Sequence, residues 1–230
     1  MAIKMLAIES ATDGCSVALR VDKNTKQSIS VQPRSHSELI LPMVDELLSE
    51  AGLELKQLDG IAFGCGPGSF TGLRIATGIV QGLAFGSNLP VVAVSSLAVL
   101  AQTAHRLYGI KNLVSSFDAR MNEIYWAVYC QNTQGLMELH GQETVCLPED
   151  VELDIDDIKS GFGSGGVYLK VFQDKYPQII NWTQDCVPEA IDLLDLAEAE
   201  YQQGNILSPE EALPVYLREA TNWKKLPGRN

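Results

Sequence analysis

Apolar residues near the start of the chain follow the pattern of short strands joined by tight turns. A buried strand is predicted at residues 5–8, an alternating strand at 15–21 and a third strand at 27–31. Thr12-Asp13-Gly14, between the first two, has the composition of a hairpin turn. The chain therefore opens with a predicted antiparallel meander of three strands.

The apolar spacing then takes the period of a helix. Apolar residues recur at helical intervals over residues 39–51, and Ser35-His36-Ser37-Glu38 before them has the spacing of a capping box. Pro42 lies within the apolar run. We therefore expect the helix either to begin at Ser37 or to kink at the proline.

Strands and helices alternate through the rest of the first half. A strand near Ile61, a glycine-rich helix, a strand at 90–94 and a helix at 95–107 are predicted. A meander that leads into helix-linked parallel strands is typical of the ribonuclease-H-like lobes of actin, heat-shock chaperones and sugar kinases.

The second half of the chain repeats this order less regularly. Strands are predicted at 112–117, 123–130 and 136–146, and helices at 188–203 and 210–219. The glycine-rich stretch 161–166 is expected to be a flexible loop, and the acidic cluster at 149–157 a solvated one. We predict an α/β fold of two actin-like lobes that share a cleft, residues 1–104 and a smaller, degenerate lobe at 105–230.

The glycine-rich helix carries the most unusual pattern in the chain. Glycine destabilises a helix interior by about 1 kcal/mol relative to alanine, yet this helix contains four glycines, namely Gly72, Gly78, Gly82 and Gly86. The absence of a side chain is useful where another backbone approaches closely. We therefore expect the helix to be packed closely against its neighbours.

A helical wheel divides this helix into two faces. The broad apolar arc contains Gly72, Ile75, Ala76, Ile79, Val80, Gly82, Leu83 and Gly86. The remaining strip contains Arg74, Thr77, Gly78, Gln81 and Phe85. Only two residues of this strip are strongly polar, so it is poorly suited to face water. Either a neighbouring helix or a partner chain is expected to cover it.

Charge and composition restrict the function. The 230 residues include 17 Lys and Arg against 29 Asp and Glu, a formal net charge of −12. Nucleic-acid binding depends on neutralising phosphates with basic side chains, so unaided binding to RNA or DNA is not expected. The N-terminus has no secretory pattern and no apolar run is long enough to span a membrane, which leads us to expect a cytoplasmic protein.

The glycine-rich turn at 64–72 resembles a phosphate-binding loop in composition. It is not a Walker A loop, because Leu73 and Arg74 stand where Lys and Ser or Thr are needed. It also lacks the acidic partner of a dinucleotide site, since no Asp or Glu occurs between Asp59 and Asp118. Contact with a nucleotide and a purely structural turn both remain open.

The first hairpin offers a second candidate. In actin-like proteins a loop at this position holds phosphate or metal. In this chain, Glu9 and Asp13 carry carboxylates that could coordinate a hydrated cation. Ordinary turn chemistry explains Asp13-Gly14 equally well. The candidate nucleotide-proximal loop consists of Glu9, Thr12, Gly66 and Gly68.

Other catalytic patterns are missing from the sequence. His36, His105 and His140 have no zinc-binding spacing, and Ser69 lacks the glycine of a nucleophile elbow. The five cysteines are scattered and contain no Cys-x-x-Cys, as expected of reduced core thiols. We expect no catalytic residue, no metal and no cofactor.

Several segments together resemble the TsaB (YeaZ) family. They are Ile8-Glu9-Ser10-Ala11-Thr12, His36-Ser37-Glu38, Gly66 to Arg74, Ala93 to Leu97, and Leu213-Pro214-Val215-Tyr216-Leu217-Arg218. The family is needed for the threonylcarbamoyl modification of adenosine 37 in tRNAs that read codons beginning with A. The resemblance implies two actin-like lobes and a non-catalytic subunit that works with the catalytic subunit TsaD and the ATPase TsaE.

The resemblance also bears on individual positions. The catalytic subunit carries a His-x-x-x-His metal pair after the strand that matches 90–94, where this chain has Ser96 and Leu100. Serine is a poor substitute for imidazole and leucine cannot ligate a metal, so the metal centre does not carry over. Contact with tRNA is then expected only through the complex.

Members of this family join TsaD through their first two helices. The resemblance therefore implies a partner interface on the outer strip, made of Leu39, Met43, Arg74, Thr77, Gly78, Gln81 and Phe85. The same surface is expected to form a homodimer when TsaD is absent. Two alternatives stay open: a nucleotide-dependent kinase or metallohydrolase of the actin-like class, and a protease, for which the sequence offers no nucleophile–base pair.

Overall fold

A five-stranded mixed sheet forms the first lobe. The computed structural model describes residues 3–31, 36–155 and 157–218. The strands of this sheet lie in the order β3-β2-β1-β4-β5. Their bounds are β1 Lys4–Glu9, β2 Cys15–Val21, β3 Asn24–Ser30, β4 Gly60–Gly66 and β5 Val91–Ser95. β1, β2 and β3 pair antiparallel, whereas β1, β4 and β5 pair parallel, as the sequence predicts.

The second sheet repeats this arrangement. Its strands lie in the order β10-β9-β6-β7-β8, with β6-β7-β8 antiparallel and β6, β9 and β10 parallel. Their bounds are β6 Asn112–Arg120, β7 Glu123–Gln131, β8 Met137–Cys146, β9 Ser160–Phe162 and β10 Asn181–Thr183. Each sheet is a three-strand meander extended by two parallel strands, so the predicted α/β fold of two lobes is confirmed.

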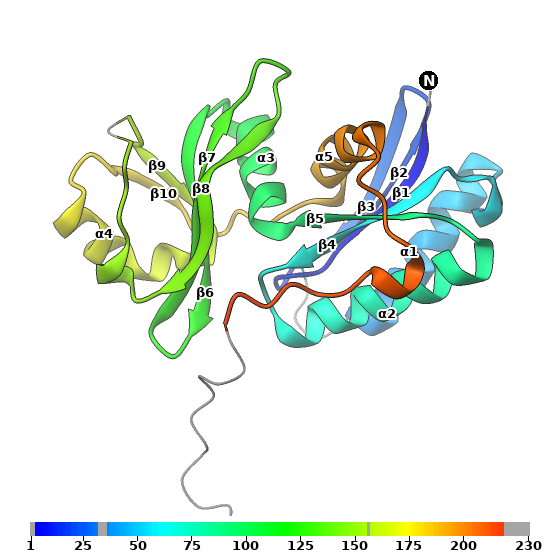
Figure 1. Ribbon diagram of the computed structural model, residues 1–230, viewed down its shortest axis with the longest axis horizontal. Helices are drawn as coiled ribbons and strands as arrows, with labels where there is room; N and C mark the ends of the chain where they lie inside the picture. Colours follow the sequence, from blue (N-terminus) through cyan, green and yellow to red (C-terminus); the bar gives the residue numbers. More distant parts are fainter. Residues whose placement is uncertain (1–2, 32–35, 156, 219–230) are drawn as a thin grey trace, which may run out of the picture.

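Helices cover both faces of the first sheet, as Figure 1 shows. Helices α1 (His36–Ala51) and α2 (Phe70–Ser87) lie on one face, and α5 (Ala190–Gln203) lies on the other. Successive side chains of a strand point to opposite faces, so Leu6 and Ile8 join the α1–α2 core while Met5 and Ala7 join the α5 core.

Helix α3 (Ser96–Tyr108) lies between the two lobes and contributes to the core of the second (Figure 1). The short helix α4 (Leu169–Lys175) packs on the second sheet. Short 3-10 turns occur at Leu55–Gln57, Pro148–Asp150, Ser164–Tyr168 and Pro209–Glu211. The predicted lobe boundary between residues 104 and 105 stays a prediction. Helix α5 follows this boundary in the chain, yet it packs on the first sheet.

Two predicted segments differ from the structure. The helix expected at 210–219 is wrong: only the 3-10 turn Pro209–Glu211 forms, and the chain to residue 218 has no helix. The predicted loop at 161–166 is instead the end of β9 followed by a 3-10 turn. Its glycines admit close neighbours, because a Cβ on Gly161 would lie 2.3 Å from the Trp182 ring.

Other local expectations have mixed outcomes. Helix α1 is described from His36 and contains Pro42, whereas the predicted cap residue Ser35 lies outside the described residues. The described acidic residues of the 149–157 cluster are exposed, as predicted, and Asp156 is not among them. Within the described ranges, none of the helices combines the length and the apolar character needed to cross a bilayer.

A candidate partner-binding face and an inward-facing hairpin loop

The Glu9 carboxyl at the end of β1 points into the protein. Its Oε1 accepts a hydrogen bond from the Ala11 amide at 2.7 Å, and its Oε2 accepts one from Ser96 Oγ at 3.0 Å. Burial raises the pKa of Glu9 to about 7, and these hydrogen bonds only partly oppose the shift. A Cβ on Gly64 would lie 1.9 Å from Oε2. The glycine therefore leaves room for the carboxyl.

The glycine-rich turn packs on the same hairpin. The Ser69 amide donates to Ala11 O at 2.7 Å, and Ser10 Oγ donates to Gly72 O at 3.0 Å. A Cβ on Gly68 would lie 2.4 Å from Ala11 O, and one on Gly72 would lie 2.1 Å from Ser10 O. The glycines at the start of α2 thus allow the glycine-rich turn to touch the first hairpin. The Ser69 amide, a main-chain donor that could hold phosphate, is already bonded to Ala11 O.

The candidate nucleotide-proximal residues come together but do not form an open surface. Glu9 and Gly66 are buried, whereas Thr12 and Gly68 are partly buried. Thr12 Oγ1 accepts a hydrogen bond from the Gly14 amide at 3.2 Å, which is ordinary turn chemistry. Gly66 has a φ of +109°, a conformation that favours glycine. The nucleotide role of this loop stays a prediction.

Thiol chemistry finds no support in the buried cysteines. Burial raises the pKa of Cys15 to about 11 and the pKa values of Cys65 and Cys186 to about 12. A thiol with such a pKa is almost fully protonated near neutral pH and is a weak nucleophile. In the described part of the chain, no three His, Cys, Asp or Glu side chains are grouped as metal ligands.

Hydrogen bonds join the second sheet to the start of α3. Glu143 of β8 accepts hydrogen bonds from Ser95, the N-cap of α3, and from the Tyr129 hydroxyl at 2.6 Å. Ser115 Oγ of β6 donates to Leu97 O at 2.8 Å. These bonds hold the second sheet to the start of α3.

Helix α2 faces its sheet through a narrower stripe than the wheel predicts. The buried residues are Gly72, Leu73, Ala76, Thr77, Val80 and Ala84. Thr77, predicted on the outer strip, is only 6% exposed, and its hydroxyl has no hydrogen-bond partner among the described residues. A helical wheel gives the angular position of each side chain around the helix axis. It does not show on which side the sheet packs, because that depends on residues outside the helix.

The outer face of α2 is rich in glycine. Gly78, Gly82 and Gly86 are exposed, and a Cβ on any of them would meet no described atom within 4 Å. Gly82 and Gly86 were predicted on the inner arc, so that part of the wheel assignment is wrong. Phe85 lies on the same face with 72% of its surface exposed. The spacing i, i+4, i+8 of the glycines is the signal that would have identified this face.

The remaining predicted interface residues are in different surroundings. Met43 is buried in the α1–α2 core at 7% exposure, and Leu39 packs partly against that core. Arg74 and Gln81 lie at the edge of the outer face, where both contact the C-terminal segment. Arg74 Nε donates to the Tyr216 hydroxyl at 3.2 Å, and Gln81 Nε2 donates to Ala212 O at 3.0 Å.

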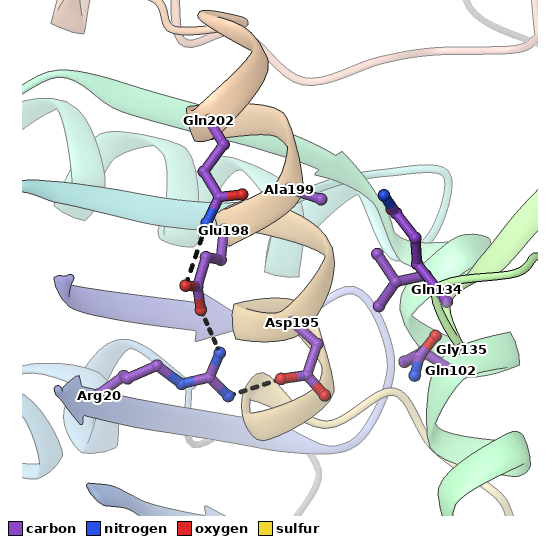
Figure 2. Close-up of a pocket in the computed structure, with 9 residues that line it drawn as sticks. Arg20, Gln102, Gln134, Gly135, Asp195, Glu198, Ala199 and Gln202 are labelled. Carbon is purple, nitrogen blue, oxygen red and sulfur yellow. Dashed lines mark hydrogen bonds and ion pairs between the residues drawn. The ribbon is translucent and has the colours of Figure 1, made fainter. Parts of the chain in front are cut away.

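A cavity of about 410 Å³ lies away from these regions, between β2, α5 and the β7–β8 hairpin. Figure 2 shows Arg20 reaching across to Asp195 and Glu198 of α5. Its third donor, Nε, is bonded to Thr25 Oγ1 at 3.1 Å. The Arg20 guanidinium is therefore already bonded to side chains of the same chain. None of the predicted site residues lines the cavity.

Comparison with known proteins agrees with this architecture. A family model described as "TsaD: tRNA N6-adenosine threonylcarbamoyltransferase" matches residues 24–159, more than half of the chain. The chain is 38% identical, over 99% of its length, to the "tRNA threonylcarbamoyladenosine biosynthesis protein TsaB" of Haemophilus influenzae and to that of Escherichia coli. The matches cover 98% and 100% of those proteins.

Solved structures give the same result. The structure of YeaZ from Pseudomonas aeruginosa matches with a TM-score of 0.87 and 43% identity, covering 94% of this chain and 100% of that chain. A second structure, of an uncharacterized protein with similarity to peptidase YEAZ from the same organism, matches with a TM-score of 0.88 and 44% identity. It covers 95% of this chain and 100% of that chain.

Proposed function

The chain belongs to the TsaB (YeaZ) family, and from that premise we propose that it takes part in tRNA threonylcarbamoyladenosine biosynthesis as a non-catalytic subunit. It binds and activates the catalytic subunit TsaD, together with TsaE. The complex then transfers the threonylcarbamoyl group to N6 of adenosine 37 in tRNAs that read codons beginning with A.

The exposed face of α2 carries this proposal. Gly78, Gly82 and Gly86 offer bare backbone to another helix, and Phe85 beside them is 72% exposed. An exposed helix gains nothing from three glycines, because each is about 1 kcal/mol less favourable than alanine. Close approach of a partner helix would offset that loss. The same face would serve a homodimer when TsaD is absent.

The inward-facing hairpin loop supports a non-catalytic role. Glu9 occupies the position of a candidate acid or metal ligand, but its carboxyl is buried and bonded to Ala11 and Ser96. A catalytic acid must reach the proton or ion that it acts on. The net charge of −12 points the same way, since a subunit so acidic would leave tRNA contact to its partner. We place this work in the cytoplasm.

Reconstitution tests the proposal. Purified TsaD, TsaE, tRNA, ATP and the threonylcarbamoyl precursors are combined with and without this chain, and modified adenosine is quantified by mass spectrometry. We expect loss of modification when the chain is omitted and no modification by the chain alone. Equal modification without the chain would overturn its role as a required subunit.

A charged side chain on the outer face of α2 tests where the partner binds. Gly78→Arg is expected to abolish co-purification with TsaD and the modification, because arginine holds the two backbones apart. Gln203→Arg adds the same charge at an exposed position of α5 and is expected to behave like the wild type. Retention of TsaD by the Gly78 variant would refute this interface.

A further inference from the structure

The C-terminal segment runs as an extended strap over α2 toward the second lobe. After α5, Leu207 pairs with Val91 at the edge of the first sheet. Residues 212–218 then have no regular secondary structure, and Figure 1 shows this orange-red segment passing along α2 to the end of β6. We call residues 212–218 the strap.

Hydrogen bonds anchor the strap to the first lobe at successive points. Ala212 is fully buried and its carbonyl accepts the bond from Gln81. The Val215 amide donates to Cys65 O at 2.8 Å. Further along, the Tyr216 ring lies 5.7 Å from the Phe70 ring. The strap therefore follows α2 in a fixed register.

The last anchor is on the second lobe. Nη2 of Arg218 donates to Ala119 O at 3.1 Å and to the Glu123 carboxylate, at the turn between β6 and β7. The Arg218 side chain is only 12% exposed. A guanidinium held by a carbonyl and a carboxylate is fixed in direction. Arg218 thus ties the end of the strap, and with it Tyr216, to the second lobe.

The strap leaves apolar side chains on the surface beside the glycine face of α2. Leu213 is 61% exposed, Tyr216 48% and Val215 43%. A segment whose only task was to shield α2 would turn such side chains inward. They instead lie exposed on the segment that is bonded to Arg74 and Gln81 at the edge of the outer face. Several large apolar side chains exposed on one short segment are typical of a site of protein association.

We propose that the strap is part of the surface that docks the catalytic subunit, and that Arg218 positions it from the second lobe. This inference rests on the proposed function. The occupant is the same partner that covers Gly78 and Phe85, because the strap is bonded along that helix through Arg74 and Gln81. Binding of the partner then depends on the second lobe, because Arg218 fixes the strap there.

The sign of one mutational effect separates a docking strap from a covering strap. If the strap only covers α2, its release by Arg218→Ala would uncover the helix and strengthen partner binding. If the strap is part of the docking surface, the same release weakens binding. Leu213→Ser changes a side chain that is mostly exposed and leaves the anchors intact, so it probes contact without disturbing the fold.

The experiment is isothermal titration of purified full-length chain with the purified catalytic subunit. We expect Arg218→Ala to weaken binding about tenfold and Leu213→Ser severalfold. Lys56→Ala, which removes an exposed ion pair with Glu54, is the control and is expected to bind like the wild type. Faster hydrogen exchange at residues 215–218 in Arg218→Ala, with an unchanged circular dichroism spectrum, would show that only the strap is released.

Two outcomes overturn the inference, and they are distinguishable from failure of the proposed function. Tighter binding by Arg218→Ala than by the wild type would make the strap a cover. Unchanged binding by Leu213→Ser together with unchanged binding by Arg218→Ala would place the strap outside the interface. Absence of binding by the wild type would refute the proposed function itself, and this inference with it.

Discussion

Glu9 brings together three elements that are distant in the chain. Strand β1 carries the carboxyl, α3 supplies the Ser96 donor, and β4 supplies the glycine that makes room for it. Its side chain is completely buried, so ionising it at neutral pH is unfavourable. The acid that looked like a ligand for a cation thus lies in the interior, with polar partners on both oxygens.

Glu9 is expected to give the protein a specific pH dependence. The pKa of Glu9 is about 7 in the folded state, and 4.5 is taken for the unfolded state. Between pH 4.5 and pH 7 the folded state therefore binds more protons than the unfolded state. The free energy of unfolding therefore falls as the pH rises from about 4.5 to 7, and above pH 7 the ionised group lowers it by roughly 3 kcal/mol. Glu9→Gln is expected to remove this fall.

Urea titrations at pH 5 and pH 8 measure this effect. The wild type and Asp45→Asn, which changes an exposed acid on α1, are expected to lose stability between the two values. Glu9→Gln should lose about 3 kcal/mol less than either. An identical loss in Glu9→Gln and the wild type would show that Glu9 does not titrate in this range.

Helix α2 has two faces with opposite requirements. The inner face, with Leu73, Val80 and Ala84, is packed on the sheet, and the outer glycine face has no described neighbour within 4 Å of its missing side chains. Thr77 belongs to the inner face although its hydroxyl is unpaired among the described residues. A buried polar group without a partner lowers stability.

Replacement of the Thr77 hydroxyl tests the inner face. Thr77→Val keeps the shape of the side chain and is expected to raise the free energy of unfolding by about 1 kcal/mol. Thr103→Val is the matched control on α3, because Thr103 Oγ1 donates to Asp192 at 2.8 Å and accepts from the Glu189 amide at 3.1 Å. It is expected to lower stability by about 2 kcal/mol. Loss of stability in Thr77→Val would mean that the hydroxyl has a partner.

Helices α3 and α5 join the lobes into one molecule. Asp192 of α5 is 1% exposed, and it accepts hydrogen bonds from Arg106 Nε at 2.7 Å and from Thr103. Burial raises the pKa of Asp192, and Arg106 and Thr103 oppose the shift. Because α3 also packs in the core of the second lobe, this ion pair connects that lobe to the helix covering the first sheet.

Removal of Arg106 is therefore expected to affect the whole molecule. Arg106→Ala leaves a buried carboxylate without its cation and should lower the free energy of unfolding by about 3 kcal/mol. Calorimetry should still show one transition, at a lower temperature. Adding Asp192→Asn removes the uncompensated charge and is expected to recover part of the loss. A variant with unchanged stability would show that the pair contributes nothing.

Local patterns predict the elements well and the site only in part. Residues 5–8, 15–21 and 90–94 have the apolar runs of strands, and strands form there. The 210–219 helix is wrong because Pro214 and the contacts of Val215 and Tyr216 with the first lobe favour an extended chain. Gly78 and Phe85 are on the outer face as predicted, but Thr77 and Met43 are not.

The order of strands and helices, the two-lobe α/β class and the lack of metal-ligand spacing were determined by the sequence itself, since each depends on residues a few positions apart. Only the tertiary structure decided that Glu9 points inward, that Thr77 faces the sheet and that the strap runs along α2. These outcomes depend on partners far along the chain, such as Ser96 for Glu9, 87 residues away, and Tyr216 for Arg74, 142 residues away. A local period fixes the spacing of side chains, but the direction in which they are buried is set by what packs against them.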